Sequence, residues 1–483
     1  MGAGEPACAA EGAERSEGPL ISPGVFREYD IRGVVGRDLT VEVANAIGSA
    51  FAALLTERKI PLVVAVGRDN RPSGVALRDA LVAGLLSAGA EVVDIGVVPT
   101  PLLYWSLHHL AVNAGIQITG SHNPPEFNGF KLCVGTSSLY GDGIQRLRAI
   151  IDTGAYPAGA GTVRQEPVID RYEDDIVARI GSLSRPLKVV FDCGNGAGAL
   201  VAPRLFPRLG LGKATMLFAE SDGTFPNHHP DPTVVENLQD LIATVRREGA
   251  DLGIGFDGDA DRIGIVDGNG TIIWGDYLLI IYARDVLART GKAHPNQSII
   301  FDVKCSQALP DAVRGAGGTP VMWKTGHSLI KEKMKELHAP IAGEMSGHMF
   351  FTEGFYGHDD AIYGAARLLR IVADSGQSVA DLLADIPRYV STPEIRIDCP
   401  DDKKFAVVAA AVAHFKRLHD VIEVDGARVL YGDGWGLIRA SNTQPILVAR
   451  FEALTQSRLD EIRSDVATWL ATQGVTFPVF SAG

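Results

Sequence analysis

Short apolar runs alternate with longer amphipathic segments along most of this chain. Apolar runs of about four to eight residues are typical of buried strands, and apolar residues repeated every three or four positions predict helices. The predicted strands are Leu62–Gly67, Glu91–Val98, Gly115–Thr119, Leu187–Asp192, Asp251–Phe256, Ser298–Asp302 and Pro340–Ala342. The predicted helices are Val41–Leu55, Gly74–Ala88, Gln239–Glu248, Asp276–Thr290 and Asp359–Ala373. This order favours an α/β fold with mostly parallel sheets covered by helices on both faces.

The pattern changes after about residue 388. Predicted strands there are Glu394–Asp398, Val421–Val424, Leu437–Ala440 and Ile446–Glu452, and predicted helices are Phe405–Leu418 and Ser457–Ala471. Strands that follow one another in this way favour an antiparallel α+β domain. With the breaks near 163–172 and 267–271, the predicted domains are 21–166, 167–271, 272–388 and 389–483, preceded by a disordered tail at 1–20.

The composition narrows the class of protein. A length of 483 residues suits about three or four domains. The net charge of −13 argues against a nucleic-acid-binding protein, which would present a basic face. No apolar run reaches the ~20 residues of a membrane span, and the acidic N-terminal segment lacks the apolar stretch of a signal peptide. Five cysteines without a C-x-x-C pair favour reduced thiols. We therefore predict a cytoplasmic protein with neither nucleic acid nor membrane as partner.

The most informative segment is Thr119–Pro124, which reads Thr-Gly-Ser-His-Asn-Pro and follows an apolar strand. In open α/β sheets, ligands bind at the carboxyl ends of strands, and this segment places the hydroxyl of Ser121 there. Backbone N–H groups of such a turn can surround an anion. A serine in a glycine-containing loop is by itself more often a turn residue than a nucleophile.

A second loop, Asp257–Arg262, carries carboxylates at alternate positions. In an extended segment Asp257, Asp259 and Asp261 would project to one side and converge on one cation. Oxygen ligands without imidazole favour Mg²⁺ over zinc. An EF-hand is excluded because Arg262 and Gly268 stand where glycine and glutamate are required. A solvated acidic turn is the alternative, but three neighbouring carboxylates without a counter-ion would repel one another.

Two further loops carry groups suited to a sugar phosphate. Gly343–His348 follows a predicted strand, and its Glu344 and Ser346 can bond sugar hydroxyls. Arg439–Thr443 combines a guanidinium, hydroxyls and an amide, which suits a phosphate, although an ordinary polar hairpin loop has the same composition. Arg450 is either a second phosphate contact or a surface residue of a strand.

A competing hypothesis comes from the turn Gly194–Ala199. This turn matches G-x-G-x-x-G/A after a predicted strand, and Glu220 follows at a distance suited to a ribose contact. The match would indicate an NAD-dependent dehydrogenase, but it leaves the serine, aspartate and Arg439–Thr443 loops unexplained. A P-loop is absent because Ala214 follows Gly212-Lys213, and a serine hydrolase would need a G-x-S-x-G turn at the serine.

Together the four loops resemble the α-D-phosphohexomutase family, and within it the bacterial phosphomannomutase/phosphoglucomutase enzymes. The likeness runs from Phe26–Gly33 to Arg450–Glu452, which is nearly the whole chain. It implies three related α/β domains with mixed, mostly parallel sheets and a C-terminal α+β domain around one central cleft. The four loops are similar to the family's phosphoserine, metal, sugar and phosphate loops. Ala260 departs from the glycine usual in the metal loop.

The resemblance implies the reversible conversion of hexose 1-phosphate and hexose 6-phosphate, of mannose or glucose, through a phosphoserine and a 1,6-bisphosphate. The partners implied are sugar phosphates, one Mg²⁺ per chain, and glucose or mannose 1,6-bisphosphate as intermediate or activator. We expect a monomer or a weak homodimer. A sugar-phosphate-binding protein without catalysis remains an alternative.

The resemblance also assigns residues. The implied metal ligands are Ser121, Asp257, Asp259 and Asp261, and the implied catalytic residues are Ser121, Lys131, Arg32, Arg262 and His348. The implied substrate-binding residues are Tyr29, Lys304, Thr325, Gly326, His327, Glu344, Ser346, His348, Arg439, Ser441, Asn442, Thr443 and Arg450. Lys131 is similar to the family's proton-transfer lysine, which requires a lowered pKa, and we expect neighbouring cations to lower it.

Overall fold

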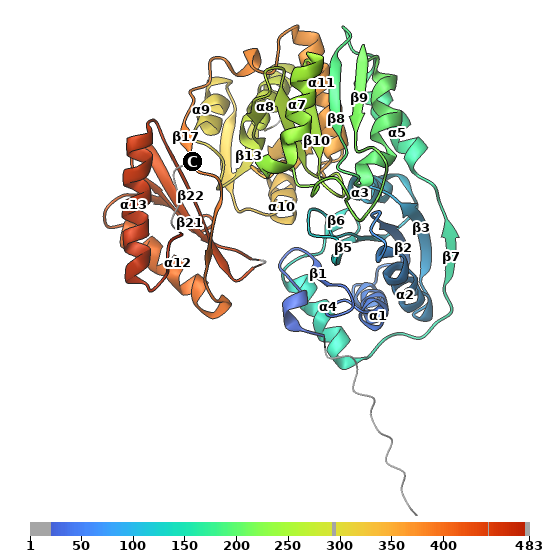
Figure 1. Cartoon of the computed structure of the whole chain (residues 1–483). Coiled ribbons are helices and arrows are strands. Elements are labelled where there is room, and N and C mark those ends of the chain that lie inside the picture. Colours follow the sequence, from blue (N-terminus) through green and yellow to red (C-terminus); the bar gives the residue numbers. More distant parts are fainter. Residues whose placement is uncertain (1–20, 292–295, 443, 479–483) are drawn as a thin grey trace, which may run out of the picture.

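The computed structural model describes residues 21–291, 296–442 and 444–478. The chain folds into four sheets, each built from its own stretch of sequence (Figure 1). The first three are mixed sheets flanked by helices, and the fourth is antiparallel. The fold-class prediction of an α/β protein with a C-terminal α+β domain is confirmed. The predicted tail at 1–20 lies outside the described residues.

The first domain has a sheet in the order β1-β5-β4-β2-β3-β7, with β6 paired to β5. Parallel pairing joins β4, β2, β3 and β7, and β5 runs antiparallel to β4 and β1. The strands are β1 (Ile31–Val34), β2 (Val63–Arg68), β3 (Glu91–Val97), β4 (Ala114–Ile118), β5 (Phe127–Val134), β6 (Ser137–Ser138) and β7 (Thr162–Gln165). The helices are α1 (Val41–Glu57), α2 (Gly74–Ser87), α3 (Thr100–His109) and α4 (Asp142–Thr153).

The second domain repeats part of this topology in a sheet ordered β12-β11-β10-β8-β9. Strands β9, β8 and β10 are parallel, and β11 returns antiparallel beside β10. The elements are α5 (Ile169–Ile180), β8 (Lys188–Asp192), α6 (Ala202–Leu205), β9 (Lys213–Leu217), α7 (Gln239–Glu248), β10 (Leu252–Phe256), β11 (Ile263–Asp267) and β12 (Ile272–Ile273).

The third domain has the same arrangement in a sheet ordered β14-β13-β15-β16. Strands β14, β13 and β15 are parallel, and β16 returns antiparallel beside β15. The elements are α8 (Gly275–Thr290), β13 (Ser298–Asp302), α9 (Ala308–Gly315), β14 (Thr319–Trp323), α10 (His327–Leu337), β15 (Ile341–Gly343), β16 (Met349–Phe351) and α11 (Ala361–Ser375).

The fourth domain is built from antiparallel pairs, with helices α12 and α13 packed against the sheet. It lies at the left of Figure 1, beside the third domain. The elements are β17 (Val390–Ser391), β18 (Ile395–Asp398), α12 (Asp401–Phe415), β19 (Asp420–Ile422), β20 (Ala427–Leu430), β21 (Gly434–Ala440), β22 (Ile446–Ala453) and α13 (Gln456–Thr472).

One continuous apolar core holds the first three domains together. It includes Trp105 of the first domain, Phe191 and Phe256 of the second, and Phe301 and Tyr363 of the third, all at most 2% exposed. The fourth domain has its own core around its sheet. Burial of apolar surface favours folding by ~25 cal/mol per Å², so this core holds the first three domains together. Each of them therefore presents its loop from a shared scaffold. None of the helices in the described ranges is both long and apolar enough to cross a membrane.

Three loops occupy equivalent positions in these three domains. Residues 119–126 join β4 to its antiparallel neighbour β5, residues 257–262 join β10 to β11, and residues 344–348 join β15 to β16. The predicted strands before these loops are present, but β5, β11 and β16 were not predicted. The loops are therefore strand-to-strand connections rather than strand-to-helix turns.

Candidate active site

The serine loop (residues 119–126) and the metal loop (residues 257–262) meet across the interface of the first two domains. The Oγ of Ser121 donates a hydrogen bond of 2.8 Å to Asp257, which lies 136 residues further along the chain. Ser121 is 2% exposed and has a φ of 48°, in the left-handed region that non-glycine residues avoid. Gly258 fits this contact closely, because a Cβ there would lie 2.4 Å from the Ser121 carbonyl oxygen.

The three aspartates converge, but not through an extended segment as the sequence suggested. The loop turns at Ala260, whose φ is 57°, and the Oδ1 of Asp257 accepts hydrogen bonds from the backbone N–H groups of Asp261 and Arg262 at 3.0 and 3.1 Å. This turn brings one ligand atom from each aspartate within 4.8 Å of the others. Ala260 thus adopts a conformation that costs an L-residue roughly 1–2 kcal/mol and costs glycine almost nothing.

The aspartate group fits a hard divalent cation. All three carboxylates are 0% exposed, and among the described residues the Oδ1 of Asp259 has no hydrogen-bond partner. Burial and the charges of Asp261 and Asp259 raise the pKa of Asp257 well above its usual range. Unpartnered carboxylate oxygens in a dry site are costly unless a cation binds them, and oxygen donors alone suit Mg²⁺.

The structure corrects the expectation for Lys131. Its ammonium donates to Asp261 and lies 3.2 Å from Asp259, so its nearest charged partners are carboxylates. Burial lowers the pKa of Lys131, but these carboxylates outweigh burial and raise the pKa above its ordinary value. The prediction that neighbouring cations lower it is wrong for this arrangement, and Lys131 is protonated.

Two more predicted catalytic residues lie where the metal loop meets the third domain. The backbones of Arg262 and His348 form an antiparallel bridge, and the Nε of Arg262 lies 3.3 Å from the Nε2 of His348. His348 also lies 3.2 Å from Asp261 and 3.0 Å from Glu344. Burial lowers the pKa of His348, but Asp261 and Glu344 outweigh burial and raise the pKa to about 9.

Arg32 lies on β1, which pairs with β5, the strand that directly follows the serine loop. Its position pairs with Gly129 of β5, two residues before Lys131. Its guanidinium bonds Asp30 at 2.6 Å, and its side chain is 21% exposed, which leaves part of it accessible to a ligand.

The predicted sugar loop is tied to the turn before α10. The backbone N–H of Gly326 donates to Glu344 at 2.7 Å, and the hydroxyl of Ser346 lies 3.2 Å from His348. Gly326 has a φ of 132°, and a Cβ there would lie 2.5 Å from the ring of Tyr29. Glycine is therefore required at this point on both conformational and steric grounds.

Neighbouring residues of this turn are oriented by buried carboxylates. The hydroxyl of Thr325 donates to Asp302 at 3.0 Å. The Nδ1 of His327 lies 3.6 Å from Asp359, which also accepts a 2.9 Å hydrogen bond from Lys331. Burial and Lys331 lower the pKa of His327 well below its usual range, so its imidazole is neutral.

The fourth domain brings its predicted phosphate loop to the same place. The hydroxyl of Tyr29 donates to the carbonyl of Thr325 at 2.8 Å and accepts from Asn442 at 2.7 Å, which links the first, third and fourth domains. Arg439 is bonded to Asp425 at 2.9 Å, and Ser441 accepts from the backbone N–H of Gln444. The predicted residue Thr443 lies outside the described residues.

Lys304 and Arg450 lie where the third and fourth domains join. The ammonium of Lys304 bonds Glu394 of the fourth domain at 3.2 Å. Arg450 is 2% exposed, lies 3.5 Å from Asp276, and donates to the carbonyl of Lys304. The interpretation of Arg450 as a surface residue is wrong, and in this arrangement its guanidinium fixes the backbone that carries Lys304.

The turn Gly194–Ala199 packs against the metal loop instead of offering a nucleotide site. The N–H of Ala197 donates to the carbonyl of Gly258 at 2.9 Å, and a Cβ on Gly196 would lie 2.8 Å from the same oxygen. The segment that follows is a 3₁₀ turn, Ala197–Leu200, and then the one-turn helix α6. The dinucleotide motif needs a long helix whose N-terminus faces the pyrophosphate, and the chain has none at this point.

Sequence reasoning did not single out Arg71 or Asp359. Both are 0% exposed, and both contact predicted site residues: Arg71 bonds the Ser121 carbonyl at 2.8 Å, and Asp359 neighbours His327. The polar residues at 68–71 directly follow a predicted strand, but the sequence pattern does not indicate which of their side chains are buried.

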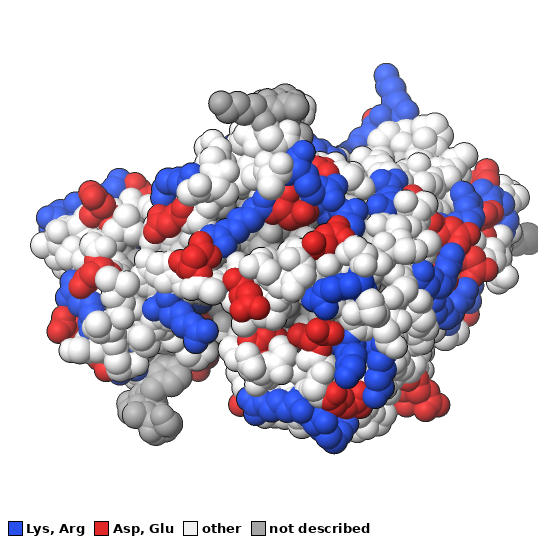
Figure 2. All heavy atoms as spheres, turned by 90° about the horizontal axis from the view of Figure 1, so that it is seen from above, with Lys and Arg blue, Asp and Glu red and all other residues white. Residues whose placement is uncertain are grey.

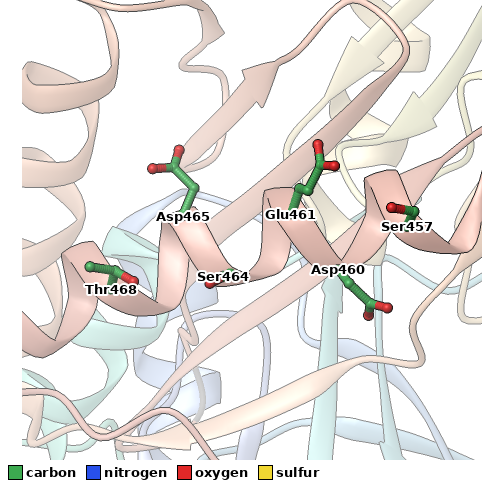
Figure 3. Close-up of a pocket in the computed structure, with 6 residues that line it drawn as sticks. All are labelled: Ser457, Asp460, Glu461, Ser464, Asp465 and Thr468. Atoms are coloured by element: carbon green, nitrogen blue, oxygen red, sulfur yellow. The ribbon is translucent and has the colours of Figure 1, made fainter.

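The face of the molecule in Figure 2 shows no cluster of one charge that would attract an anion. Figure 2 shows basic and acidic side chains interspersed, so attraction of an anion depends on cations within the site. A shallow hollow follows the solvent face of α13 (Figure 3), and it contains none of the predicted site residues. It is lined by Ser457, Asp460, Glu461, Ser464, Asp465 and Thr468.

Comparisons with known proteins agree with this arrangement. Four phosphoglucomutase/phosphomannomutase domain models match the chain: alpha/beta/alpha domain I at residues 23–156, domain II at 170–270, domain III at 274–389 and the C-terminal domain at 394–468. A phosphomannomutase/phosphoglucomutase of Pseudomonas aeruginosa is 47% identical over 465 residues, which cover 96% of this chain and 99% of that protein.

Two further matches extend the comparison. A phosphoglucomutase of Neisseria gonorrhoeae is 44% identical and covers 92% of this chain and 96% of its own length. A crystal structure of a phosphoglucomutase/phosphomannomutase family protein from Burkholderia thailandensis has a TM-score of 0.88 at 44% identity and covers 95% of this chain and 100% of that one. The chain therefore belongs to the phosphoglucomutase/phosphomannomutase family.

Proposed function

We propose that this enzyme interconverts hexose 1-phosphate and hexose 6-phosphate, of mannose or glucose, through a phosphoserine at Ser121 and a hexose 1,6-bisphosphate. The observation that carries the proposal is the 2.8 Å contact between the Ser121 hydroxyl and Asp257 within a group of three buried aspartates. A hydroxyl beside a cation-binding group is what phosphoryl transfer requires. The names of the relatives support the substrate class.

The reaction balances as two transfers. In the first, the bond between phosphorus and Ser121 Oγ breaks and a bond to O6 of the hexose 1-phosphate forms. The bisphosphate then turns around in the site, and O1 gives its phosphoryl group to Ser121. In each transfer one oxygen loses a proton and the other gains one, so a single group that exchanges protons with both is sufficient. We assign this exchange to Lys131: protonated beside Asp259 and Asp261, it acts first as the acid that gives a proton to Ser121 Oγ and is then reprotonated by the attacking O6 hydroxyl, and the second transfer reverses this order with O1.

Charge stabilisation is the larger part of this catalysis. Asp257, Asp259 and Asp261 would hold one Mg²⁺ together with an oxygen of Ser121. When bound, Mg²⁺ would neutralise charge on the transferring phosphoryl group. Arg262, bridged to His348, and the partly exposed Arg32 would contribute further positive charge from this chain.

Recognition of the sugar falls to the third and fourth domains. Glu344 and Ser346 would accept and donate hydrogen bonds to O3 and O4, and Arg439, Ser441 and Asn442 would bind the phosphate that is not being transferred. Because none of these contacts needs the C2 hydroxyl, we expect the enzyme to accept both epimers. A ratio of kcat/KM beyond ~1000 between glucose 1-phosphate and mannose 1-phosphate would rule out dual use.

The test of the proposed function is the phosphorylation state and activity of Ser121→Ala. The wild-type protein treated with glucose 1,6-bisphosphate should gain about 80 Da in intact mass, the size of one phosphoryl group. Ser121→Ala should gain none and lose at least ~1000-fold in kcat while still binding glucose 6-phosphate. Ser106→Ala is the control, because Ser106 is equally buried but bonds a helix carbonyl in α3. Wild-type turnover by Ser121→Ala would remove Ser121 from the mechanism, whereas absence of turnover in the wild type would favour the non-catalytic sugar-phosphate-binding protein.

A further inference from the structure

Arg71, which follows β2, is bonded to most of the loop that carries Ser121. Its side chain is 0% exposed. Its guanidinium donates hydrogen bonds to four backbone carbonyls, those of Ser121 at 2.8 Å, Asn123 at 2.6 Å and Pro124 at 2.6 Å in the loop, and that of Phe127 at 3.0 Å at the start of β5. A guanidinium presents its donors in a rigid planar fork, so these four bonds fix the path of the loop as well as its distance.

A buried carboxylate completes this arrangement. The Nε of Arg71 donates to Asp69 at 3.2 Å, and Asp69 also accepts from the backbone N–H of Gly120 at 3.0 Å. Gly120 leaves room for the guanidinium, because a Cβ there would lie 2.4 Å from the Cζ of Arg71. On the other side, the ring of Phe225 of the second domain covers the guanidinium with its centroid 5.0 Å away. Arg71 is thus enclosed between the serine loop and the second domain.

The bond to the Ser121 carbonyl has a directional consequence. In a planar trans peptide the N–H of the next residue points opposite to the carbonyl, so the N–H of His122 points away from Arg71. A backbone N–H turned away from a cation can donate to an anion, such as a phosphoryl group on the neighbouring serine. Arg71 therefore sets the orientation of a phosphate-binding group that it does not itself provide.

Backbone strain is concentrated at this interface. Ser121, Asn195, Phe225 and Ala260 are non-glycine residues with φ between 48° and 57°, and each lies in a loop that contacts the serine loop, Arg71 or the metal loop. Strained residues persist only where surrounding contacts hold them, and they are typical of functional sites. For Ser121 the contacts that hold the strained conformation include the bond of Arg71 to its carbonyl, the bond of its hydroxyl to Asp257, and the bond of its backbone N–H to Thr119.

We propose that Arg71 is a positioning residue for phosphoryl transfer, which holds Ser121 and the His122 N–H in the orientation that the phosphoryl group requires. The proposal rests on the proposed function, because it takes Ser121 as the phosphorylated residue. A purely structural role would predict lower stability with normal turnover per folded molecule. A positioning role predicts a loss of kcat in protein that is folded and binds substrate normally.

Arg71→Lys is the decisive variant. Lysine keeps the charge opposite Asp69 but cannot reach four carbonyls from one ammonium. We expect kcat to fall about 100-fold, KM for glucose 1-phosphate to change less than about 3-fold, and phosphorylation of Ser121 by glucose 1,6-bisphosphate to slow about as much as kcat. Arg367→Lys is the matched control, because Arg367 is 1% exposed on α11 and bonds Glu353 and Asp285 away from the site. This control should keep kcat within about 3-fold of wild type.

A folded Arg71→Lys protein with wild-type kcat and wild-type rate of Ser121 phosphorylation would overturn the proposal. If Arg71→Lys does not fold, Gly120→Ala decides, because it retains the arginine and displaces its guanidinium; normal kcat in that variant would equally overturn the proposal. Activity in Ser121→Ala removes the proposed function, whereas an inactive Ser121→Ala beside a fully active Arg71→Lys removes only the role of Arg71.

Discussion

Gly258 lies between two of the metal-loop aspartates, and one added methyl group there separates the two catalytic loops. Its φ is outside the left-handed region, so alanine can adopt its backbone conformation. The added Cβ would nevertheless lie 2.4 Å from the Ser121 carbonyl oxygen and 3.2 Å from its carbon. An ordinary contact is about 3.4 Å or longer, so the serine loop and the metal loop would move apart by about 1 Å.

A displacement of this size has a calculable consequence. Misplacing reacting groups by about 1 Å costs on the order of 100-fold in rate, which corresponds to about 2.7 kcal/mol in the barrier. Overpacking of this kind also costs roughly 1–3 kcal/mol of stability, well within what a protein of this size tolerates. We therefore expect Gly258→Ala to be folded at 25 °C, to retain its KM for glucose 1-phosphate, and to lose about 100-fold in kcat.

The assay is steady-state turnover of glucose 1-phosphate with saturating Mg²⁺ and glucose 1,6-bisphosphate, with a thermal melt of each variant. The matched control is Gly255→Ala, three residues earlier on β10, where a Cβ would meet side chains of the core at 3.4 Å or more. The control should keep kcat within about 3-fold of wild type. If Gly258→Ala turns over as fast as Gly255→Ala, the contact between the two loops does not set the catalytic geometry, and the reasoning above is refuted.

Three other perturbations address the rest of the site. Asp257→Asn should lose at least ~100-fold in kcat and should no longer gain thermal stability on addition of Mg²⁺, whereas the wild type should; an equal Mg²⁺-induced shift in both would contradict the assigned ligand set. Tyr29→Phe removes a hydroxyl that bonds both the third and the fourth domain, so we expect KM to rise roughly 30-fold from the loss of two bonds worth about 1 kcal/mol each, with kcat little changed. Lys304 lowers the pKa of Glu394 to about 2, so this carboxylate stabilises the fold above about pH 4.5 and loses that contribution as pH falls towards 2. The melting temperatures of wild type and Glu394→Gln should therefore differ at pH 7 and converge below pH 4.5, and a constant difference would contradict the pairing with Lys304.

The sequence predicted the parallel strands and the long helices well because their residues are uniformly apolar or regularly amphipathic. The predicted strand Ser298–Asp302 and helix Gln239–Glu248 have these bounds in the structure. The antiparallel strand β5 was missed because its buried positions include Asn128 and Lys131, polar residues that interrupt the alternation. Of these two residues, Lys131 contacts Asp259 and Asp261 of the site, whereas Asn128 points to the other face of the strand and bonds Ser73.

Local sequence patterns could not predict the contacts between segments that lie far apart in the chain. The three aspartates were recognised from their spacing, but the turn at Ala260 that brings them together was not. The environment of Lys131 depends on residues more than 120 positions away, so the sign of its pKa shift was wrong when inferred from sequence. The domain boundaries and the roles of the individual site residues stay predictions.

The topology explains why the catalytic groups come from three domains and not from one. In each of the first three sheets the loop with the predicted site residues joins a parallel strand to its antiparallel neighbour. Each domain therefore presents one loop at the end of its sheet where the parallel strands have their carboxyl ends. Because these domains share one apolar core, the sheet ends that carry the three loops cannot move independently. The fourth domain has its own core and joins the third through a small apolar cluster of Val303, Trp435 and Leu437, and it reaches the site through polar contacts such as the one between Asn442 and Tyr29. Polar contacts of this kind can exchange with water or ligand at little net cost, whereas separating a shared core cannot. We therefore expect the fourth domain, rather than the three domains that share a core, to be the part whose position relative to the site can change.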